Sequence, residues 1–310
     1  MEFSHVSVLL NETVSSLGVK SGGIYADGTL GGGGHTEAIL SLLPDIKVIG
    51  IDQDLDAHKA AGKRLEGFKE RFIPVHSNFS NIKNVLASLG VDGLDGAVLD
   101  LGVSSYQLDE ASRGFSYMHD APLDMRMNRE AELSAFEVIN SYSEEKLTEI
   151  FYSYGEEKWS KRIAEFICRE RKESPVKTTG ELVKIIESAI PKAARLEGGH
   201  PAKRVFQAVR IEVNGELRIL EQAIRDFAEV LNPGGRLSII TFHSLEDRIV
   251  KNTFKDLCTD CICPKEFPVC VCGHKAQCRL ISRKPVLPSK EELEVNSRSR
   301  SAKLRIIEKI

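Results

Sequence analysis

Residues 23–52 read GIYADGTLGGGGHTEAILSLLPDIKVIGID, and this stretch decides the fold of the chain. It begins with a short apolar strand that ends at Asp27, and four consecutive glycines, residues 31–34, follow soon after. Apolar residues then recur at helical spacing, and a second apolar strand ends at Asp52. Strand, glycine loop, helix, strand and acidic residue form the layout of a nucleotide-binding βαβ unit.

The glycine loop is suited to hold a ligand. Glycines permit positive φ and let the backbone lie against a bound molecule. The free N–H groups at the start of the following helix favour a carboxylate or another anion. Asp52 can accept hydrogen bonds from both hydroxyls of a ribose. A plain flexible turn is the alternative, but the acidic residues on either side of the loop favour cofactor binding.

The same stretch indicates which nucleotide cofactor the loop would bind. The G-x-G-x-x-G pattern of a pyrophosphate-binding loop fits poorly, because Ala38 lies near its third glycine position. The glycines are not followed by G-K-[S/T], which excludes a P-loop. Asp27, directly before the loop, suits a ligand with an amino group and a positive centre. These features favour S-adenosylmethionine over NAD or ATP.

Length and composition are those of a soluble globular protein. The chain has 310 residues, of which 42% are hydrophobic and 28% charged. Its net charge is -3, so nucleic acid would have to bind through local basic patches. Apolar runs stay well below the ~20 residues that cross a bilayer, and the N-terminal residues do not resemble a signal peptide. We therefore expect a cytoplasmic protein with no membrane partner.

Strands and helices alternate on both sides of a helical interruption. Further strands are predicted at 72–75, 96–101, 236–241 and 303–308, the last of them at the sheet edge. Between about 103 and 199 the pattern is helical, with helices predicted near 143–154, around Trp159 and from Thr179 to Pro191. The fold class is therefore α/β, with a mostly parallel, Rossmann-like sheet formed by 1–102 and 203–310 and an all-helical domain inserted over 103–202.

Two residues at strand ends could take part in chemistry. Asp100 ends the strand over 96–101, at the edge where open α/β sheets bind ligands. It could accept a hydrogen bond from the amino group of a cofactor or substrate, or cap the next segment. His243 follows the strand over 236–241 and could face a substrate or be structural, while Ser244 with Asp247 could cap the next helix.

Two local cationic stretches could contact RNA phosphates. One comprises Lys192, Arg195 and the segment 201–210, PAKRVFQAVR, and the other holds Arg298, Arg300, Lys303 and Arg305. Each could equally be a solvated face. The inserted domain and the acidic remainder of the chain make an RNA contact competitive for the first.

Six of the seven cysteines gather late in the chain, at Cys258, Cys261, Cys263, Cys270, Cys272 and Cys278. C-x-x-C spacing lets two thiolates reach one tetrahedral zinc ion, whereas the C-x-C pairs are less usual. A metal site and a group of thiols therefore both stay open, so no metal ligand is assigned. A metal here would be structural rather than catalytic.

Six motifs together resemble one known family. They are DGTLGGGGHT at 27–36, DLGVSS at 100–105, RGFS at 113–116, PLDMRM at 122–127, FQAVRI at 206–211 and FHSLEDR at 242–248. In this order, across nearly the whole chain, they resemble the bacterial 16S ribosomal RNA cytosine-N4 methyltransferase family (small-subunit rRNA methyltransferase H). The resemblance does not settle the role of the cysteines.

The resemblance implies a class I methyltransferase fold, S-adenosylmethionine as methyl donor, and as acceptor a cytidine in the decoding region of 16S rRNA, within the small ribosomal subunit. Carried over position by position, the cofactor contacts fall on Gly33, Gly34, His35, Asp52, Phe79, Asp100 and Gln107. Phe79 would offer the adenine an apolar face. Asp100 is also the candidate catalytic residue, which would accept a hydrogen bond from the cytidine amino group.

Three other functions stay open at this point. The first is an S-adenosylmethionine-dependent methyltransferase of a protein or small molecule, against which the first cationic stretch argues. The second is a Rossmann dehydrogenase, which the imperfect pyrophosphate motif disfavours. The third is a zinc-containing RNA-binding protein without activity. The sequence also leaves open the oligomeric state and the choice between free rRNA and an assembled 30S particle as substrate.

Overall fold

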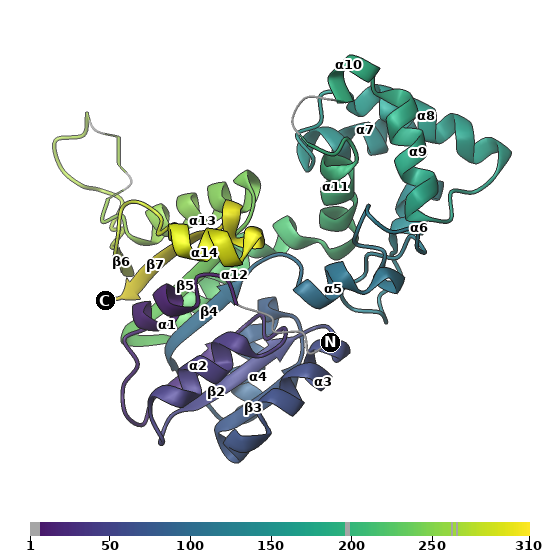
Figure 1. Cartoon of the computed structure of the whole chain (residues 1–310). Helices are drawn as coiled ribbons and strands as arrows, with labels where there is room; N and C mark the ends of the chain where they lie inside the picture. Colours follow the sequence, from purple (N-terminus) through teal and green to yellow (C-terminus); the bar gives the residue numbers. More distant parts are fainter. Residues whose placement is uncertain (1–6, 196–198, 262, 265) are drawn as a thin grey trace. The chain divides into compact units, whose positions relative to one another are not determined.

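A computed structural model describes residues 7–195, 199–261, 263–264 and 266–310 (Figure 1). The chain divides into two compact units. The first combines the residues up to Gly102 with Leu217–Ile310, and the second is Val103–Glu216. Within these described ranges, each helix is too short or too polar to cross a bilayer.

The first unit is built on a seven-stranded sheet whose strand order is β3-β2-β1-β4-β5-β7-β6. Five strands are parallel to one another: β1 (Ile24–Asp27), β2 (Lys47–Asp52), β3 (Phe72–His76), β4 (Leu94–Asp100) and β5 (Leu231–Thr241). The last two, β6 (Cys278–Leu280) and β7 (Lys303–Lys309), pair antiparallel at one end of the sheet. The predicted α/β class with a mostly parallel sheet is confirmed.

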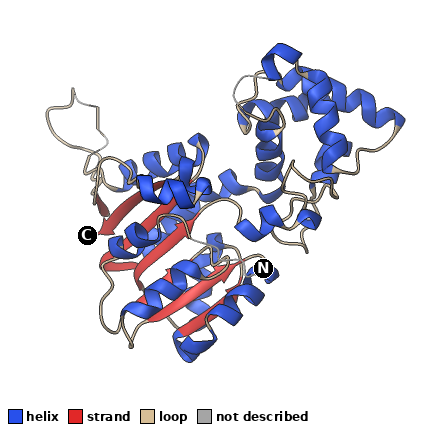
Figure 2. Cartoon of the chain, in the orientation of Figure 1, coloured by secondary structure: helices blue, strands red, loops and turns tan. Residues whose placement is uncertain are grey.

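Helices cover both faces of this sheet (Figure 2). One face carries α1 (Leu10–Ser16), α2 (Gly34–Leu42) and α3 (Leu55–Arg64), and the other carries α4 (Ile82–Leu89), α12 (Glu216–Val230) and α13 (Ser244–Leu257). Neighbouring strand residues alternate between the two cores, as Val48 and Ile49 do. Because both faces are buried, the strands are nearly continuous apolar runs, which is why the sequence reveals them.

Two expectations about the sheet are wrong. The sequence places the strand over 303–308 at the edge, but the short strand β6 pairs with its outer side. Three residues are too few to show a period in the sequence. The strand predicted from Arg236 begins instead at Leu231. Leu94 pairs with Leu231 and Gly96 with Arg236, so residues 232–235 form an irregularity within β5.

The second unit is helical. In chain order it contains α5 (Ser105–Asp109), η3 (Ala111–Arg113), α6 (Ala135–Ser141), α7 (Glu144–Ser153), α8 (Ser160–Glu173), α9 (Thr179–Ala189), α10 (Lys192–Arg195) and α11 (Lys203–Asn214). Their apolar faces enclose one core. Thr178 caps α9 through a capping box with Glu181, which is a start signal that the sequence shows.

The second boundary of this unit differs from the predicted one. The sequence ends the insertion at residue 202, but the helical unit extends to Glu216 and includes α11. Val205 and Val209 of α11 are buried in the helical core, whereas Leu220 of α12 is buried in the core of the sheet. Both helices are amphipathic, and the pattern does not say which core each one faces.

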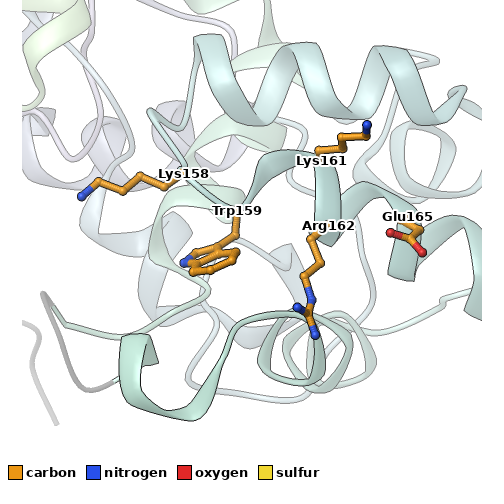
Figure 3. A pocket seen from close by; sticks show the side chains of 5 residues that line it. All are labelled: Lys158, Trp159, Lys161, Arg162 and Glu165. Atoms are coloured by element: carbon orange, nitrogen blue, oxygen red, sulfur yellow. The ribbon is translucent and has the colours of Figure 1, made fainter.

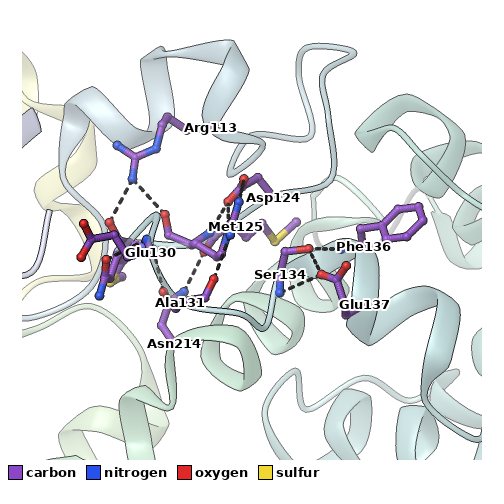
Figure 4. A network of polar contacts seen from close by, with 12 residues as sticks. Arg113, Asp124, Met125, Glu130, Ala131, Ser134, Phe136, Glu137 and Asn214 are labelled. Atoms are coloured by element: carbon purple, nitrogen blue, oxygen red, sulfur yellow. Dashed lines mark hydrogen bonds and ion pairs between the residues drawn. The ribbon is translucent and has the colours of Figure 1, made fainter. Parts of the chain in front are cut away.

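Polar contacts hold the irregular segment between η3 and α6 (Figure 4). Arg113 is only 1% exposed and donates to the carbonyls of Arg126 and Met127 at 2.9 and 3.2 Å. Asn214, at the end of α11, accepts from the Met127 N–H at 2.8 Å and donates to the Met125 carbonyl at 2.8 Å. These contacts satisfy backbone groups that a loop otherwise leaves unpaired.

Replacing Asn214 with Ala should lower the free energy of unfolding by about 2–4 kcal/mol, because the backbone groups of Met125 and Met127 lose their partners. Urea unfolding of the full chain measures this effect. Gln222→Ala, which removes only an exposed contact with Asp226, should change it by less than about 0.5 kcal/mol. An equally small change for Asn214→Ala would show that the segment does not depend on α11.

Candidate active site

Three acidic residues lie at the carboxyl ends of neighbouring parallel strands. Asp27 ends β1, Asp52 ends β2 and Asp100 ends β4. Since β1 lies between β2 and β4, the strand order changes direction between β1 and β4. In open α/β sheets, ligands bind in the crevice at such a point. The sheet therefore brings the predicted acidic residues to one edge.

The glycine loop between β1 and α2 is tied to the next strand. Leu30 donates its N–H to the carbonyl of Ile51 at 3.0 Å, and Gly31 donates to Oδ2 of Asp52 at 2.8 Å. Gly31 and Gly33 have φ values of +50° and +78°, which side chains other than glycine rarely adopt. The loop thus needs its glycines to reach the carboxyl edge.

Two glycines of the loop leave no space for a side chain. A Cβ on Gly34 would clash with Oγ of Ser7, and a Cβ on Gly28 would clash with Cδ2 of Leu99. Gly34 is also the first residue of α2. The helix therefore begins with bare backbone, whose N–H groups favour a ligand carboxylate.

Asp27 is buried beneath the loop. It is 1% exposed and accepts hydrogen bonds from the Thr36 hydroxyl at 2.8 Å and the Thr29 N–H at 3.2 Å. Burial raises the pKa of Asp27 to about 6, although both hydrogen bonds act in the opposite direction. Its carboxylate connects the end of β1 to the loop and to the first turn of α2.

The raised pKa of Asp27 makes stability depend on pH in a defined direction. Ionisation costs more in the folded chain than in the unfolded chain, so this contribution to stability is complete below about pH 4 and is lost as the pH rises through about 6. Asp27→Asn removes the titration. The free energy of unfolding of the variant minus that of the wild type should rise by about 2–2.5 kcal/mol from pH 4 to pH 7. Urea unfolding at several pH values tests this, and a constant difference would contradict it.

Asp100 carries a carboxylate oxygen without a partner. Its Oδ1 atom is buried and makes no hydrogen bond with any described residue, while Oδ2 lies 3.9 Å from Nδ1 of His35. Burial, and to a lesser extent the charges of Asp27 and Glu246, raise the pKa of Asp100 well above its usual range. A ligand that brings an amino group or a positive charge would satisfy this oxygen.

Backbone and side-chain contacts fix the surroundings of Asp100. Its N–H donates to Oγ1 of Thr29 at 2.6 Å. His35, which is 5% exposed, places its Nε2 atom 3.1 Å from the carbonyl of Val8. Thr29 and Glu246 are not predicted from the sequence as site residues. Their signals are the DGT and HSLED segments, but a sequence does not show that the two segments approach Asp100.

Asp52 and Phe79 lie on the other side of the glycine loop. The Asp52 carboxylate accepts a second hydrogen bond, in addition to that from Gly31, from the N–H of Asp54 at 2.9 Å. Burial raises the pKa of Asp52. Phe79 begins η2 (Phe79–Asn81) and is half-buried. Its Cβ atom would be 3.2 Å from a Cβ on Gly28, so Phe79 borders the loop.

Gln107 belongs to the helical unit. It is 5% exposed, and its Oε1 atom accepts from the Ser104 N–H at 3.0 Å in the capping box of α5. The structure therefore gathers six of the seven predicted cofactor residues in the first unit: Gly33, Gly34, His35, Asp52, Phe79 and Asp100. The seventh, Gln107, lies in the second unit.

His243 has a structural role. It is the N-cap of α13, and its Nε2 atom lies 3.0 Å from Oε1 of Glu246. Glu246 also accepts from the N–H groups of Phe242 and His243. The capping pair is therefore His243 and Glu246, not the predicted Ser244 and Asp247, because an imidazole nitrogen can accept the same backbone bond as a hydroxyl.

The sequence matches the model of the MraW methylase family over residues 2–310. The chain belongs to the MraW methylase family. This MraW-family chain is 62% identical over 311 residues to "Ribosomal RNA small subunit methyltransferase H" of Clostridium botulinum (strain Loch Maree / Type A3), and 57% identical to the protein of that name from Clostridioides difficile (strain 630). Both alignments cover 100% of each chain.

Among solved structures, an rRNA methylase from Streptococcus thermophilus aligns with a TM-score of 0.43 and 11% identity, over 97% of this MraW-family chain and 93% of the other. The family predicted from the six motifs is confirmed by the full-length sequence relatives. Membership in a methylase family is inconsistent with the dehydrogenase and with the inactive RNA-binding protein that the sequence leaves open.

Several cations predicted as RNA contacts are instead bound within this MraW-family chain. Lys303 and Arg305 bind Asp247 at 3.1 and 2.7 Å. Arg210 forms a bidentate ion pair with Glu216, in which the guanidinium nitrogens lie 2.9 and 2.8 Å from the two carboxylate oxygens. Lys192 and Lys203 are exposed, as the RNA interpretation requires.

The helical unit of the MraW-family chain carries another basic surface, which is not predicted from the sequence. An open hollow of about 250 Å³ is lined by Lys158, Trp159, Lys161, Arg162 and Glu165 (Figure 3). Cations beside an aromatic ring can bind phosphates and stack on an unpaired base. We call this surface the α8 hollow.

Proposed function

We propose that this chain transfers a methyl group from S-adenosylmethionine to the exocyclic N4 of a cytidine in the decoding region of 16S rRNA. The full-length identity to small-subunit rRNA methyltransferases supports the reaction class. The observation that carries the atomic proposal is the buried Oδ1 of Asp100, which has no partner among the described residues and lies at the end of β4.

S-adenosylmethionine fits the residues at the carboxyl edge. The bare backbone at the start of α2, where Gly34 lies, suits a ligand carboxylate, and the unpaired oxygen of Asp100 suits a cationic centre. We propose that Gly33, Gly34 and His35 line the cofactor's amino-acid end, that Asp52 holds the ribose and that Phe79 contacts the adenine. Gln107 is proposed as a further contact. When bound, S-adenosylmethionine supplies an electrophilic methyl group on a positively charged sulfur.

Asp100 would orient the cytidine amino group. A carboxylate that accepts an N–H of N4 concentrates the nitrogen lone pair for attack on the methyl carbon. The raised pKa of Asp100 makes it a stronger base than an exposed aspartate, so it could receive the proton that N4 loses. Holding both reactants in line contributes up to about 7–11 kcal/mol in well-oriented systems.

The cytidine must leave its stack before it can reach the methyl group. We propose that the helical unit binds the surrounding RNA, and that the α8 hollow is one of its contact surfaces. The partner would be 16S rRNA, within the small ribosomal subunit.

Transfer of labelled methyl from S-adenosylmethionine to 16S rRNA and to 30S particles, followed by nucleoside analysis, tests the reaction. Label in N4-methylcytidine on either substrate supports the proposal. Label in a different nucleoside, or no label on either substrate, overturns it. Label on particles alone would identify the assembled subunit as the substrate.

Replacing both Lys161 and Arg162 with Ala should weaken RNA binding without changing affinity for S-adenosylmethionine. Each lost phosphate contact should reduce the slope of log affinity against log salt by about 0.7–0.9. Filter binding at several salt concentrations measures this slope. The control is Lys146→Ala, which removes an exposed lysine of the same unit that is paired with Glu149. Equal slopes for the double variant and the wild type would exclude the α8 hollow as an RNA contact.

A further inference from the structure

The described residues of the loop between α13 and β6, 258–277, are ordered neither by regular secondary structure nor by burial in a hydrophobic core. The loop's described residues form no helix or strand, and none of them is buried. Loops longer than about 12–15 residues without secondary structure are uncommon in compact domains unless something else orders them. Hydrogen bonds fasten its ends, where Gln277 donates to the Leu257 carbonyl at 2.8 Å and Ala276 to Asp260 at 3.3 Å.

Four cysteine sulfurs meet inside this loop. The Sγ atoms of Cys261, Cys263, Cys270 and Cys272 all lie within 4.8 Å of one another. Cys270 is 3.5 Å from both Cys261 and Cys272, and Cys261 is 3.8 Å from Cys272. Four sulfurs bound tetrahedrally at about 2.3 Å from one zinc ion would be about 3.8 Å apart. The spacing in the structure is thus that of a single-ion site.

We propose that these four thiolates bind one Zn²⁺ ion and that this ion orders the 258–277 loop. An iron–sulfur cluster needs room for several irons and sulfides between its cysteines, and these short separations leave room for one ion. With four protein ligands, the ion has no open position for water or substrate. The site is therefore structural and independent of methyl transfer.

The remaining cysteines of the group have other surroundings. Cys278 is 1% exposed and belongs to the core of the sheet, against which Cys258 also packs. His274 places Nε2 3.5 Å from the Asp256 carbonyl. The ligand set thus consists of two C-x-C pairs, and the C-x-x-C pair that the sequence suggests, Cys258 with Cys261, is not used as a pair.

Backbone amides point at the sulfurs of this cluster. The Cys263 N–H donates to Sγ of Cys261 at 3.4 Å, and the Val271 N–H donates to Sγ of Cys263 at 3.3 Å. Four thiolates around one zinc ion leave a net charge of -2, which N–H donors of this kind stabilise. Gly273, directly after Cys272, has φ +62°, a conformation that residues with a side chain rarely adopt. The loop conformation and the positions of the four sulfurs are therefore both consistent with one bound zinc ion.

Zinc content of the full chain, purified without a metal-binding tag and under reducing conditions, tests the proposal. Elemental analysis should find about one zinc per chain. Changing both Cys270 and Cys272 to Ser should reduce this to about a tenth or less. The matched control Cys168→Ser, a half-buried cysteine of α8, should keep the full content. Cobalt substituted for zinc should show the visible absorption of a tetrahedral thiolate site in the wild type and in the control only.

Two results would overturn the proposal. The first is a reduced wild-type chain that holds no zinc after incubation with the metal, and the second is a double serine variant that holds as much as the control. A wild-type measurement covers the case in which the variant does not fold: a thiol-modifying reagent should release the ion as four thiols react, and a chelator should speed proteolysis within 258–277. Zinc release without loss of those thiols, or unchanged proteolysis, would count against it.

Discussion

Asp100→Asn should lower the rate of methyl transfer by about 100-fold or more, because a side chain that accepts and holds a proton typically contributes 10²–10⁴-fold. The variant should stay folded. Its free energy of unfolding should equal or exceed that of the wild type, because the change removes a partly buried acid whose ionised form is repelled by Asp27 and Glu246. Single-turnover kinetics on 30S particles and urea unfolding measure the two effects.

Cofactor affinity separates the two roles proposed for Asp100. If it holds the cytidine amino group, transfer falls and the Kd for S-adenosylmethionine changes little. If it binds only the cofactor, both are lost together, and the direct role is wrong. The pH profile adds a third readout. Since burial raises the pKa of Asp100, the wild-type rate should increase with pH above the usual carboxyl range, and this limb should vanish in the variant. Asp226→Asn, which loosens a surface ion pair with Lys83, is the control.

Asp52→Ala should raise the Kd for S-adenosylmethionine by about 100-fold or more. Two hydrogen bonds from ribose hydroxyls to a carboxylate contribute about 1.5–3 kcal/mol each, and every 1.4 kcal/mol is about tenfold in affinity. The carboxylate also holds the N–H groups of Gly31 and Asp54, so the loop loses a restraint in the same variant.

Isothermal titration with S-adenosylmethionine measures this loss. Asp54→Ala is a close control, because Asp54 is a buried acid two residues away whose side chain instead caps α3 by accepting the Asp56 N–H at 3.0 Å. That control should cost about 1 kcal/mol of stability and leave cofactor affinity within a few-fold. Equal affinity of Asp52→Ala and the wild type would exclude Asp52 as the ribose ligand.

Most of the sheet can be predicted from the sequence because each parallel strand is buried on both faces and therefore stands out as an apolar run. The misassignment of α11 has a different origin. Its apolar positions form a regular helical stripe, but the stripe does not identify the partner, and Val205 and Val209 face the helical core. Strand β6 cannot be predicted, because Cys278–Leu280 is too short to display any period.

The candidate site likewise has features that can be predicted from the sequence and others that cannot. Asp27, Asp52 and Asp100 could be found because strand ends are visible in the sequence and the carboxyl ends of parallel strands share one edge. The approach of Glu246 to Asp100 depends on β5 lying beside β4, although more than a hundred residues separate the two segments. The position of the four zinc-ligand candidates was equally hidden, since spacing alone favours a C-x-x-C pair whose first member packs against the sheet core.

In the sequence, the helical unit is inserted between β4 and β5, and this order affects how the sheet forms while the chain is synthesised. The outer edge of β4 pairs with β5, whose first residue, Leu231, is made only after the whole of Val103–Glu216. At about 5–20 residues per second, this delay is roughly 6–26 s. Throughout it, the nascent sheet exposes an apolar strand with unpaired N–H and C=O groups, the kind of edge that recruits other chains. Translation speed and chaperone supply across this interval should therefore affect yield more than the final stability of the protein does.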